Sequence, residues 1–169
     1  MGIRVKDGVV FGVEKLVSSK LLVEGSGKRI FHVAEHAAVC VAGLAADCRQ
    51  LVLRARSEAS SWAGLYGSPI PVAVLAERVA SYAHQFTLFA SLRPFGCSVM
   101  VAGHDAAKGY QLFSIDSAGT AFGYRGTAIG KAGSSARNEI EKLKLDQLTA
   151  REAVRHVAHI VHSVHDEVK

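Results

Sequence analysis

The first forty residues alternate between apolar runs and turn-forming residues, a pattern that predicts β-strands. The turn Lys6-Asp7-Gly8 joins apolar runs at residues 2–5 and 9–14, as in a tight β-hairpin. Two more runs follow at residues 29–33 and 37–42, and the second is almost entirely apolar. A continuous apolar run is typical of a strand that is covered on both faces.

Apolar residues then recur at helical spacing in two stretches, which predicts two consecutive amphipathic helices. The first stripe consists of Leu44, Cys48, Leu51, Val52, Ala55, Ala59 and Trp62. The second consists of Leu75, Val79, Tyr82, Ala83 and Phe86. Glycine and proline residues separate the two stripes, and the turn Arg93-Pro94-Phe95-Gly96 ends the second.

The second half of the chain repeats this order of strands followed by helices. Strands are predicted at residues 98–103, 110–115, 121–124 and 127–129, with short links of the hairpin kind between them. A helix should then run from Gly133 to about Lys144. Thr149 and Glu152 form a capping box at the start of the last helix.

Strands in runs, followed by helices in runs, favour an α+β fold with antiparallel sheets and helices outside them. We expect each half of the chain to form one sheet with its two helices. Stacking the halves sheet on sheet would give a four-layer helix–sheet–sheet–helix sandwich. The 169 residues are predicted to form a single domain, 1–169, without a linker or a repeat.

Composition and charge exclude several classes of function. No apolar run approaches the roughly 20 residues of a membrane span, so a soluble protein without a membrane partner is expected. The net charge of +5 is modest. Arg49, Arg54 and Arg56 gather on one predicted helix beside Glu58, and this cluster is best interpreted as a solvated helix face. No nucleic-acid partner is expected, because a dedicated binder shows a denser basic stripe or a known module.

The three cysteines, Cys40, Cys48 and Cys97, contain no Cys-x-x-Cys pair. All three lie on predicted apolar surfaces of strands or helices. We interpret them as reduced, mostly buried thiols that act as small hydrophobic residues.

Two patterns resemble binding sites but fail on spacing. The segment from Gly126 to Ala132 looks like a phosphate loop, yet only three residues separate its glycines where a phosphate loop has four, and Ala132 lacks the hydroxyl that would hold magnesium. It is interpreted as a tight strand-to-helix joint. Histidines recur every third residue in the last helix, but each step rotates about 60° backwards, so four of them cannot meet at one ion. These are His156, His159, His162 and His165. No cofactor and no metal are therefore expected.

Six short segments resemble sequence motifs of eukaryotic 20S proteasome α-type subunits, in the same order along nearly the whole chain. They are Lys6-Asp7-Gly8-Val9-Val10, Val13-Glu14-Lys15, Ser19-Lys20-Leu21, Ala42-Gly43-Leu44-Ala45-Ala46-Asp47, Arg93-Pro94-Phe95-Gly96-Cys97-Ser98 and Thr127-Ala128-Ile129-Gly130-Lys131-Ala132. Within the family, two segments are most similar to the type-3 branch: Phe11-Gly12-Val13-Glu14-Lys15 and the ending Val164-His165-Asp166-Glu167-Val168-Lys169.

The resemblance implies the fold of N-terminal-nucleophile hydrolases, used without their chemistry. Catalytic relatives attack peptides with an N-terminal threonine, whose amine is the base. This chain begins Met1-Gly2, and neither residue is a nucleophile. By alignment Glu14 occupies the acid position of that site and Arg29 the lysine position, where arginine stays charged. A non-catalytic subunit is expected.

The same resemblance implies a role at surfaces. Family members form a heteroheptameric α ring that stacks on the β ring and controls substrate entry for intracellular, ubiquitin-dependent protein degradation in cytoplasm and nucleus. Expected partners are neighbouring α subunits, β subunits, and the C-terminal tails of activators or regulatory ATPases. Arg29 matches the basic residue that contacts the tail carboxylate, with Lys28 beside it and Gly43 and Leu44 as the apolar wall.

The family also has a first N-terminal helix, a gate segment and an acidic C-terminal extension that have no counterpart in this sequence, so truncation at the N-terminus is expected. A chain this short is not expected to gate the pore, and its assembly into a ring should be weakened. Two alternatives compete with the scaffolding role. One is a stand-alone hydrolase of the same fold, which would need an exposed N-terminal Thr, Ser or Cys. The other is a nucleic-acid-binding protein, whose affinity would fall steeply with salt.

Overall fold

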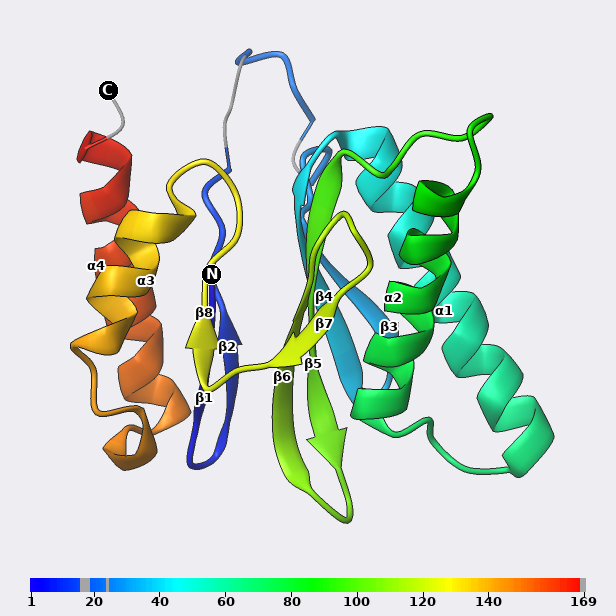
Figure 1. The fold of residues 1–169 in the computed structure, drawn as a ribbon. Coiled ribbons are helices and arrows are strands. Elements are labelled where there is room, and N and C mark those ends of the chain that lie inside the picture. Colours follow the sequence, from blue (N-terminus) through cyan, green and yellow to red (C-terminus); the bar gives the residue numbers. More distant parts are fainter. Residues whose placement is uncertain (16–18, 24, 168–169) are drawn as a thin grey trace.

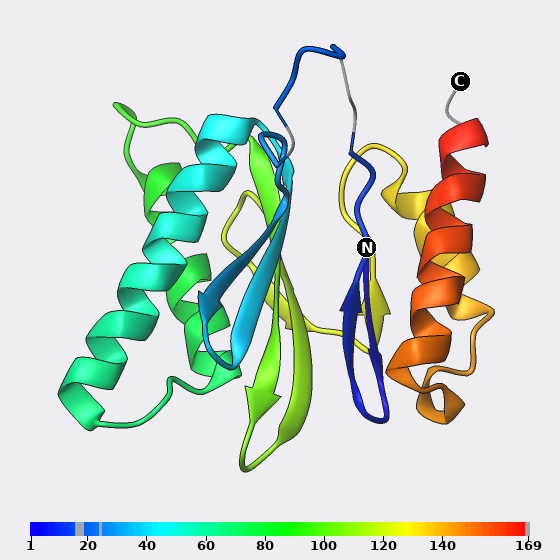
Figure 2. The ribbon, with the colours of Figure 1, turned by 180° about the vertical axis from the view of Figure 1, so that it is seen from behind.

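The computed structural model describes residues 1–15, 19–23 and 25–167, and these form four layers (Figures 1 and 2). Two antiparallel sheets face each other in the middle. Helices α1 (Ala45–Tyr66) and α2 (Val72–Leu88) cover the outer face of one sheet. Helices α3 (Gly133–Glu141) and α4 (Ala150–Glu167) cover the outer face of the other. The predicted α+β sandwich with helices outside is confirmed.

The two sheets differ in size, and strand pairing within both is antiparallel. Sheet A has the order β2-β1-β8, with β1 at Gly2–Val5, β2 at Gly8–Phe11 and β8 at Gly126–Thr127. Sheet B has the order β3-β4-β5-β6-β7. Its strands are β3 (Ile30–Ala34), β4 (Ala37–Gly43), β5 (Cys97–Asp105), β6 (Gly109–Ile115) and β7 (Ala121–Gly123).

The prediction that each half of the chain forms its own sheet is wrong. Sheet B takes β3 and β4 from the first half and pairs β4 with β5 from the second, while β8 returns to pair with β1. The link at Tyr124 and Arg125 is therefore a crossing between sheets and not a hairpin. The pairing of β4 with β5 extends over seven residue pairs, from Ala37 with Gly103 to Gly43 with Cys97. This long ladder gives hydrogen bonds to two buried strands that would otherwise be edges.

Several element ends differ from the prediction for local reasons. Strand β2 ends at Phe11 and not at residue 14, although Gly12 still exchanges two backbone hydrogen bonds with Met1, at 2.8 and 3.0 Å. Helix α3 ends at Glu141, because the backbone N–H groups of Lys142 and Leu143 donate to carbonyls only three residues back. A short 3₁₀ turn, η1 (Leu145–Gln147), follows.

Three apolar clusters fill the layers. The largest lies between sheet B and helices α1 and α2, and includes fully buried Leu75 and Val79. A second lies between sheet A and helices α3 and α4, around Ile3. A third lies between the sheets and contains Cys40, Met100 and Leu112. All three cysteines are free and buried, as predicted. None of the described helices combines the length and apolar character needed to cross a membrane.

The start of α4 is fixed by two independent caps. Thr149 and Glu152 form the predicted box: the Thr149 N–H donates to Glu152 Oε2 at 2.8 Å, and the Glu152 N–H donates to Thr149 Oγ1 at 3.3 Å. The hydrogen bonds that the Glu152 carboxylate accepts from the Thr149 N–H and hydroxyl lower the pKa of Glu152. Asp7 of the β1–β2 turn accepts the Ala150 N–H at 2.7 Å, a contact that no local pattern indicates. The hairpin turn therefore helps to hold the last helix in place.

Replacing Thr149 with alanine should lower the free energy of unfolding by about 1 kcal/mol, because one side of the box is lost at the N-terminus of α4. For a chain of this size we expect the melting temperature to fall by roughly 2–4 °C. Thermal unfolding followed by circular dichroism measures the change. Ser60→Ala removes a hydroxyl from the exposed face of α1 and should not destabilise the protein. Equal losses in both variants would contradict a capping role for Thr149.

Candidate functional site

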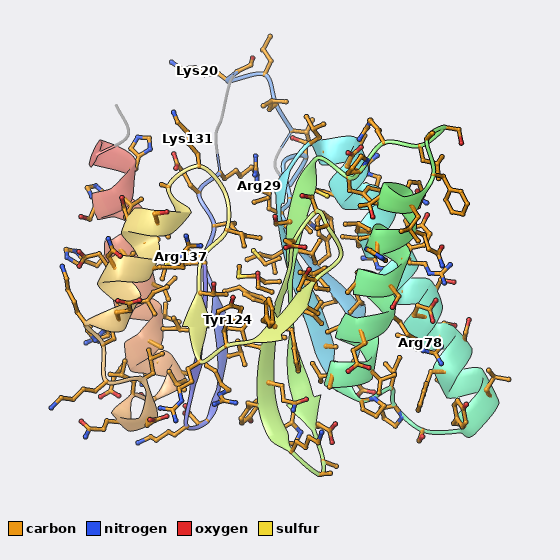
Figure 3. The ribbon with its side chains drawn as sticks, in the orientation of Figure 1. Lys20, Arg29, Arg78, Tyr124, Lys131 and Arg137 are labelled. Carbon is orange, nitrogen blue, oxygen red and sulfur yellow. The ribbon has the colours of Figure 1, made fainter. Side chains whose placement is uncertain are left out.

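Arg29 lies at the junction of three hollows at one end of the molecule. It lines a cavity of about 410 Å³ between the sheets, an open hollow of about 480 Å³ near Gly96, and a smaller hollow of about 170 Å³ beside the start of α1. Figure 3 places Arg29, Lys131 and Lys20 at this same end of the fold. Lys131 lines the first two hollows with Arg29. Arg29, which the family resemblance indicated as a binding residue, therefore lies in a wall that the three hollows share.

The smallest hollow is lined by cations from three separate segments. Lys28 and Arg29 precede β3, Lys15 follows β2, and Arg49 lies in the first turns of α1. The described residues that line it include no acidic side chain. Ala45, the first residue of α1, also lines it, so the positive end of a helix dipole adds to the charge. The hollow is suited to a carboxylate or another small anion.

Gly43 and Leu44, the other two predicted site residues, are placed differently. Gly43 lines both hollows outside the central cavity, and its φ of +129° is a conformation that favours glycine. Leu44 is 58% exposed and does not belong to the described lining of either hollow. It lies against Gly96 instead: its backbone N–H donates to the Gly96 carbonyl at 3.0 Å. The expected apolar wall at Leu44 is therefore beside the hollows and not in them.

Two of the sequence motifs that carry the family resemblance form one structural unit beneath the hollows. Asp47, at the start of α1, accepts hydrogen bonds from both Arg93 Nη atoms at 2.7 and 2.9 Å and from the Gly96 N–H at 2.7 Å. The Arg93 hydrogen bonds, and then the one from Gly96, lower the pKa of the buried Asp47 to about 2. The motif at 42–47 is thereby tied to the motif at 93–98, across about fifty residues of sequence.

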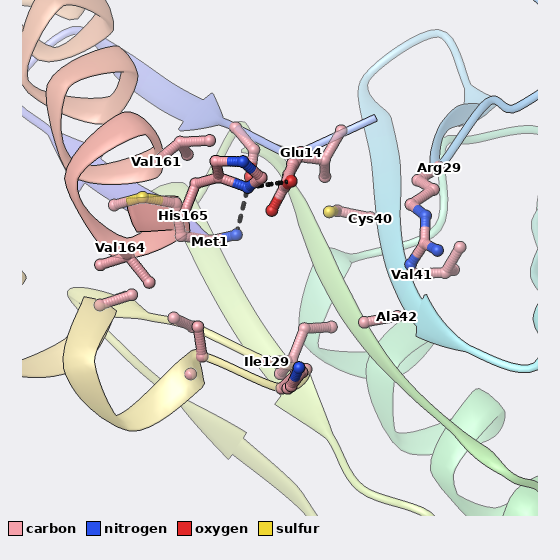
Figure 4. Close-up of a pocket in the computed structure, with 18 residues that line it drawn as sticks. Met1, Glu14, Arg29, Cys40, Val41, Ala42, Ile129, Val161, Val164 and His165 are labelled. Atoms are coloured by element: carbon pink, nitrogen blue, oxygen red, sulfur yellow. Dashed lines mark hydrogen bonds and ion pairs between the residues drawn. The ribbon is translucent and has the colours of Figure 1, made fainter. Parts of the chain in front are cut away.

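The central cavity lies between the sheets and has a mostly apolar lining. Figure 4 shows Cys40, Val41 and Ala42 of β4 on one side and Val161 and Val164 of α4 on the other. The described residues that line it include no serine or threonine. Burial raises the pKa of Cys40, which keeps this thiol protonated. A protonated thiol is a poor nucleophile.

Glu14 and Arg29, which align with the acid and lysine positions of catalytic relatives, do not form a pair with each other. Glu14 Oε1 lies 2.5 Å from Nδ1 of His165 at the end of α4. Figure 4 shows this contact, with Arg29 on the far side of the cavity beyond Cys40. Glu14, which aligns with the catalytic acid of those relatives, is thus paired with His165. This partner was not predicted from the sequence. The contact links the end of sheet A to the helical layer.

The histidines of α4 do not converge on an ion. Within the part of the chain that the structure describes, no group of three His, Cys, Asp or Glu side chains could hold a metal. His165 faces Glu14, while His159 is exposed on the outer surface of the helix. The rotation between successive positions of the helix separates these two side chains.

The false phosphate loop is a joint between β8 and α3. Gly130 has φ +97°, and Arg137 Nη1 of α3 donates to the Ala128 carbonyl at 3.0 Å, which closes the joint (Figure 3 labels Arg137). Helix α3 has no side-chain cap at Ala132. The joint contributes Lys131 to the cavity, a residue that sequence reasoning considered only as part of a failed motif.

The basic cluster predicted on one helix is divided among three roles. Arg49 lines the small hollow, Arg56 Nε donates to the His32 carbonyl at 3.0 Å, and Arg54 forms an ion pair with Glu58. Glu58 also accepts a hydrogen bond from Arg78 at 2.8 Å, which is the main cause of its lowered pKa. Arg49 and Arg56 are exposed, as a solvated face requires, but Arg56 also ties α1 to β3.

Comparison with known proteins supports the family resemblance over the full length of the chain. Residues 1–169 match the family described as "Proteasome subunit". The chain is 54% identical to a rice protein named "Proteasome subunit alpha type-3" and 51% identical to a Dictyostelium discoideum protein of the same name. Each alignment covers 100% of this chain and 68% of the relative. A Saccharomyces cerevisiae protein named "Probable proteasome subunit alpha type-7" is 42% identical, and the match covers 59% of its length.

Proposed function

Since the chain belongs to the proteasome subunit family, we propose that it acts as a non-catalytic α-type subunit that binds the C-terminal tails of activators at Arg29. The observation that carries this proposal is the position of Arg29 at the junction of three hollows. A tail carboxylate at the smallest hollow would meet cations and the start of α1, without an acidic neighbour among the described lining residues.

Several observations support the absence of peptidase activity. The central cavity lacks serine and threonine among its described lining residues, and its one thiol, Cys40, is kept protonated by burial. Glu14 is engaged by His165. A nucleophile activated by a nearby base, which hydrolases of this kind need, has no candidate here. The stand-alone hydrolase is accordingly not favoured.

A role in assembly is supported by large apolar side chains that remain exposed in the isolated chain. Leu21 and Val23, in the segment between β2 and β3, are 92% and 78% exposed. Leu65 and Tyr66 at the end of α1, and Phe89 after α2, are exposed as well. Apolar groups at several sites are expected of a subunit that is covered by neighbours in a ring.

Tail binding at Arg29 predicts a loss of affinity when the charge is reversed. We expect Arg29→Glu, in the assembled particle, to weaken binding of a short apolar peptide with a free C-terminal carboxylate by at least about tenfold. Fluorescence anisotropy with a labelled peptide measures the affinity. Arg155→Glu changes the same charge on the exposed face of α4 and should leave the affinity within about twofold.

The peptide supplies a second control for the same prediction. Amidation of its C-terminus removes the carboxylate, and the wild-type particle should then bind about as weakly as Arg29→Glu binds the free acid. If the free acid and the amide bind wild type equally, the carboxylate is not recognised and the proposed role of Arg29 is wrong.

Ring membership is tested separately by the mass of the native particle. Light scattering of the chain co-expressed with α-type partners should give a ring-sized particle that contains this chain. The chain purified alone provides the reference mass. A monomer or dimer under both conditions would contradict a scaffolding role in the ring, whatever the peptide measurements show.

A further inference from the structure

Two cysteines from different elements meet beneath the Arg29 hollows. Cys48 lies in the first turns of α1, and Cys97 is the first residue of β5. Each side chain is 5% exposed, and the two thiols share a hydrogen bond. The third cysteine, Cys40, belongs to a different apolar cluster between the sheets. The chain thus contains one dithiol pair and one separate thiol.

The backbone holds this pair together through three links. Cys97 is paired with Gly43 in the β4–β5 ladder. The N–H of Leu44 donates to the Gly96 carbonyl at 3.0 Å, and the N–H of Cys48 donates to the Leu44 carbonyl at 2.9 Å. The Asp47 carboxylate adds its hydrogen bond to the Gly96 N–H. The thiols are therefore placed by paired strands and by the start of a helix, and not by mobile segments.

The two thiols have different chemistry. The S–H of Cys97 donates to Cys48, and this hydrogen bond is the main cause that lowers the pKa of Cys48, with help from the charge of Arg29. The same bond raises the pKa of Cys97. Cys48 is thus the thiol that ionises first and the better nucleophile of the two.

Both thiols border open space. Cys48 lines the small hollow with Arg29, and Cys97 lines the larger open hollow with Lys131. Each of the two residues thus borders a hollow large enough to hold a molecule the size of hydrogen peroxide. An adjacent second thiol is the usual arrangement where an oxidised cysteine is resolved into a disulfide.

We propose that Cys48 and Cys97 form a reversible redox site that a small hydroperoxide closes into a disulfide. The Cys48 thiolate attacks the peroxide, which breaks the O–O bond, gives a sulfenic acid at Cys48 and releases water. The Cys97 sulfur then attacks the Cys48 sulfur and displaces the hydroxyl as a second water. The two thiols lose two electrons and two protons, and hydrogen peroxide is reduced to two molecules of water.

The disulfide would join α1 to β5 at the residue that pairs with Gly43, and Gly43 lines both hollows. Cross-linking two segments far apart in sequence stabilises the fold mainly by restricting the unfolded chain. We expect oxidised protein to melt roughly 5–10 °C higher than reduced protein. Formation of the bond does not depend on whether tails bind at Arg29.

The test is carried out on the purified, fully reduced chain. After brief treatment with hydrogen peroxide, the peroxide is removed and the chain is unfolded in denaturant, so that every free thiol is labelled with a maleimide before digestion for mass spectrometry. We expect two of the three cysteines to escape labelling, a peptide in which Cys48 is linked to Cys97, and a rise in melting temperature that dithiothreitol reverses. Cys40→Ser should behave like wild type, and Cys97→Ser should give neither the linked peptide nor the rise.

The disulfide-linked peptide from wild-type protein tests the proposal even if a serine variant folds poorly. Cys97→Ala provides a second, apolar replacement. The proposal is overturned if all three thiols remain labelled, if Cys48 accumulates as sulfinic acid, or if the linked peptide contains Cys40. It is also overturned if oxidised Cys97→Ala shows the same rise in melting temperature as wild type.

Discussion

Replacing Gly43 with alanine should lower the free energy of unfolding by about 3 kcal/mol. The residue has φ +129°, which a residue with a Cβ adopts only with strain. An added Cβ would also collide with the Gly96 carbonyl and lie 2.6 Å from Cys97 Cα. These obstacles are backbone atoms of a paired strand and cannot turn away as a flexible side chain would. Urea unfolding at equilibrium measures the loss.

Gly64→Ala is the matched control for this change. Gly64 lies in α1 with no atom within 4 Å of the added Cβ. Its replacement should raise the free energy of unfolding by up to about 1 kcal/mol, because alanine favours helix more than glycine does. If Gly43→Ala is as stable as wild type, the backbone at the end of β4 tolerates a side chain. That result would contradict the close packing of Gly43 against Gly96 and Cys97.

Replacing Asp47 with alanine should be the second most damaging of these changes, with a loss of about 2 kcal/mol at pH 7. The variant loses three hydrogen bonds to a buried carboxylate and leaves the Gly96 N–H without its partner. A larger loss of stability is not expected, because the Arg93 side chain is 67% exposed and solvent weakens its attraction to Asp47. Asp146→Ala removes a carboxylate from the exposed pair with Arg125 and should cost less than about 0.5 kcal/mol.

The contribution of Asp47 should also depend on pH in a defined direction. Its pKa in the folded protein is about 2, below the ordinary value of 3.8 for an aspartate side chain. The folded state therefore binds this proton less readily than the unfolded state, so acid favours unfolding. The stabilisation should be complete above about pH 4 and should disappear as the pH falls towards 2. Unfolding of wild type and Asp47→Asn at several pH values measures it, and a constant difference between them would contradict the assignment.

Local patterns in the sequence were sufficient for most elements and for the layer order. Periodicity located α1 and α2, and the turn at Lys6–Asp7 and the box at Thr149 and Glu152 were confirmed, because each depends on residues a few positions apart. The ends of β2 and α3 were predicted too long, since hydrophobic patterns continue past the point where backbone partners stop.

Only some residues of the candidate site could be predicted from the sequence. Alignment with family motifs indicated Lys28, Arg29 and Gly43, but Lys15, Arg49 and Lys131 were missed as contributors to the hollows. They come from a segment after β2, a helix start and a strand-to-helix joint, and no spacing in the sequence connects these three. The pair of Glu14 with His165 was missed for the same reason.

By itself the sequence determined the family and the α+β class, because these follow from residue identity and short-range order. Only the tertiary structure decided that the strands of both halves mix in each sheet, and that Asp47 holds Arg93 and Gly96. It alone brought Cys48 to Cys97. Such contacts join residues far apart in the chain, and their partners are selected by strand pairing and burial of the whole fold, which no local pattern encodes.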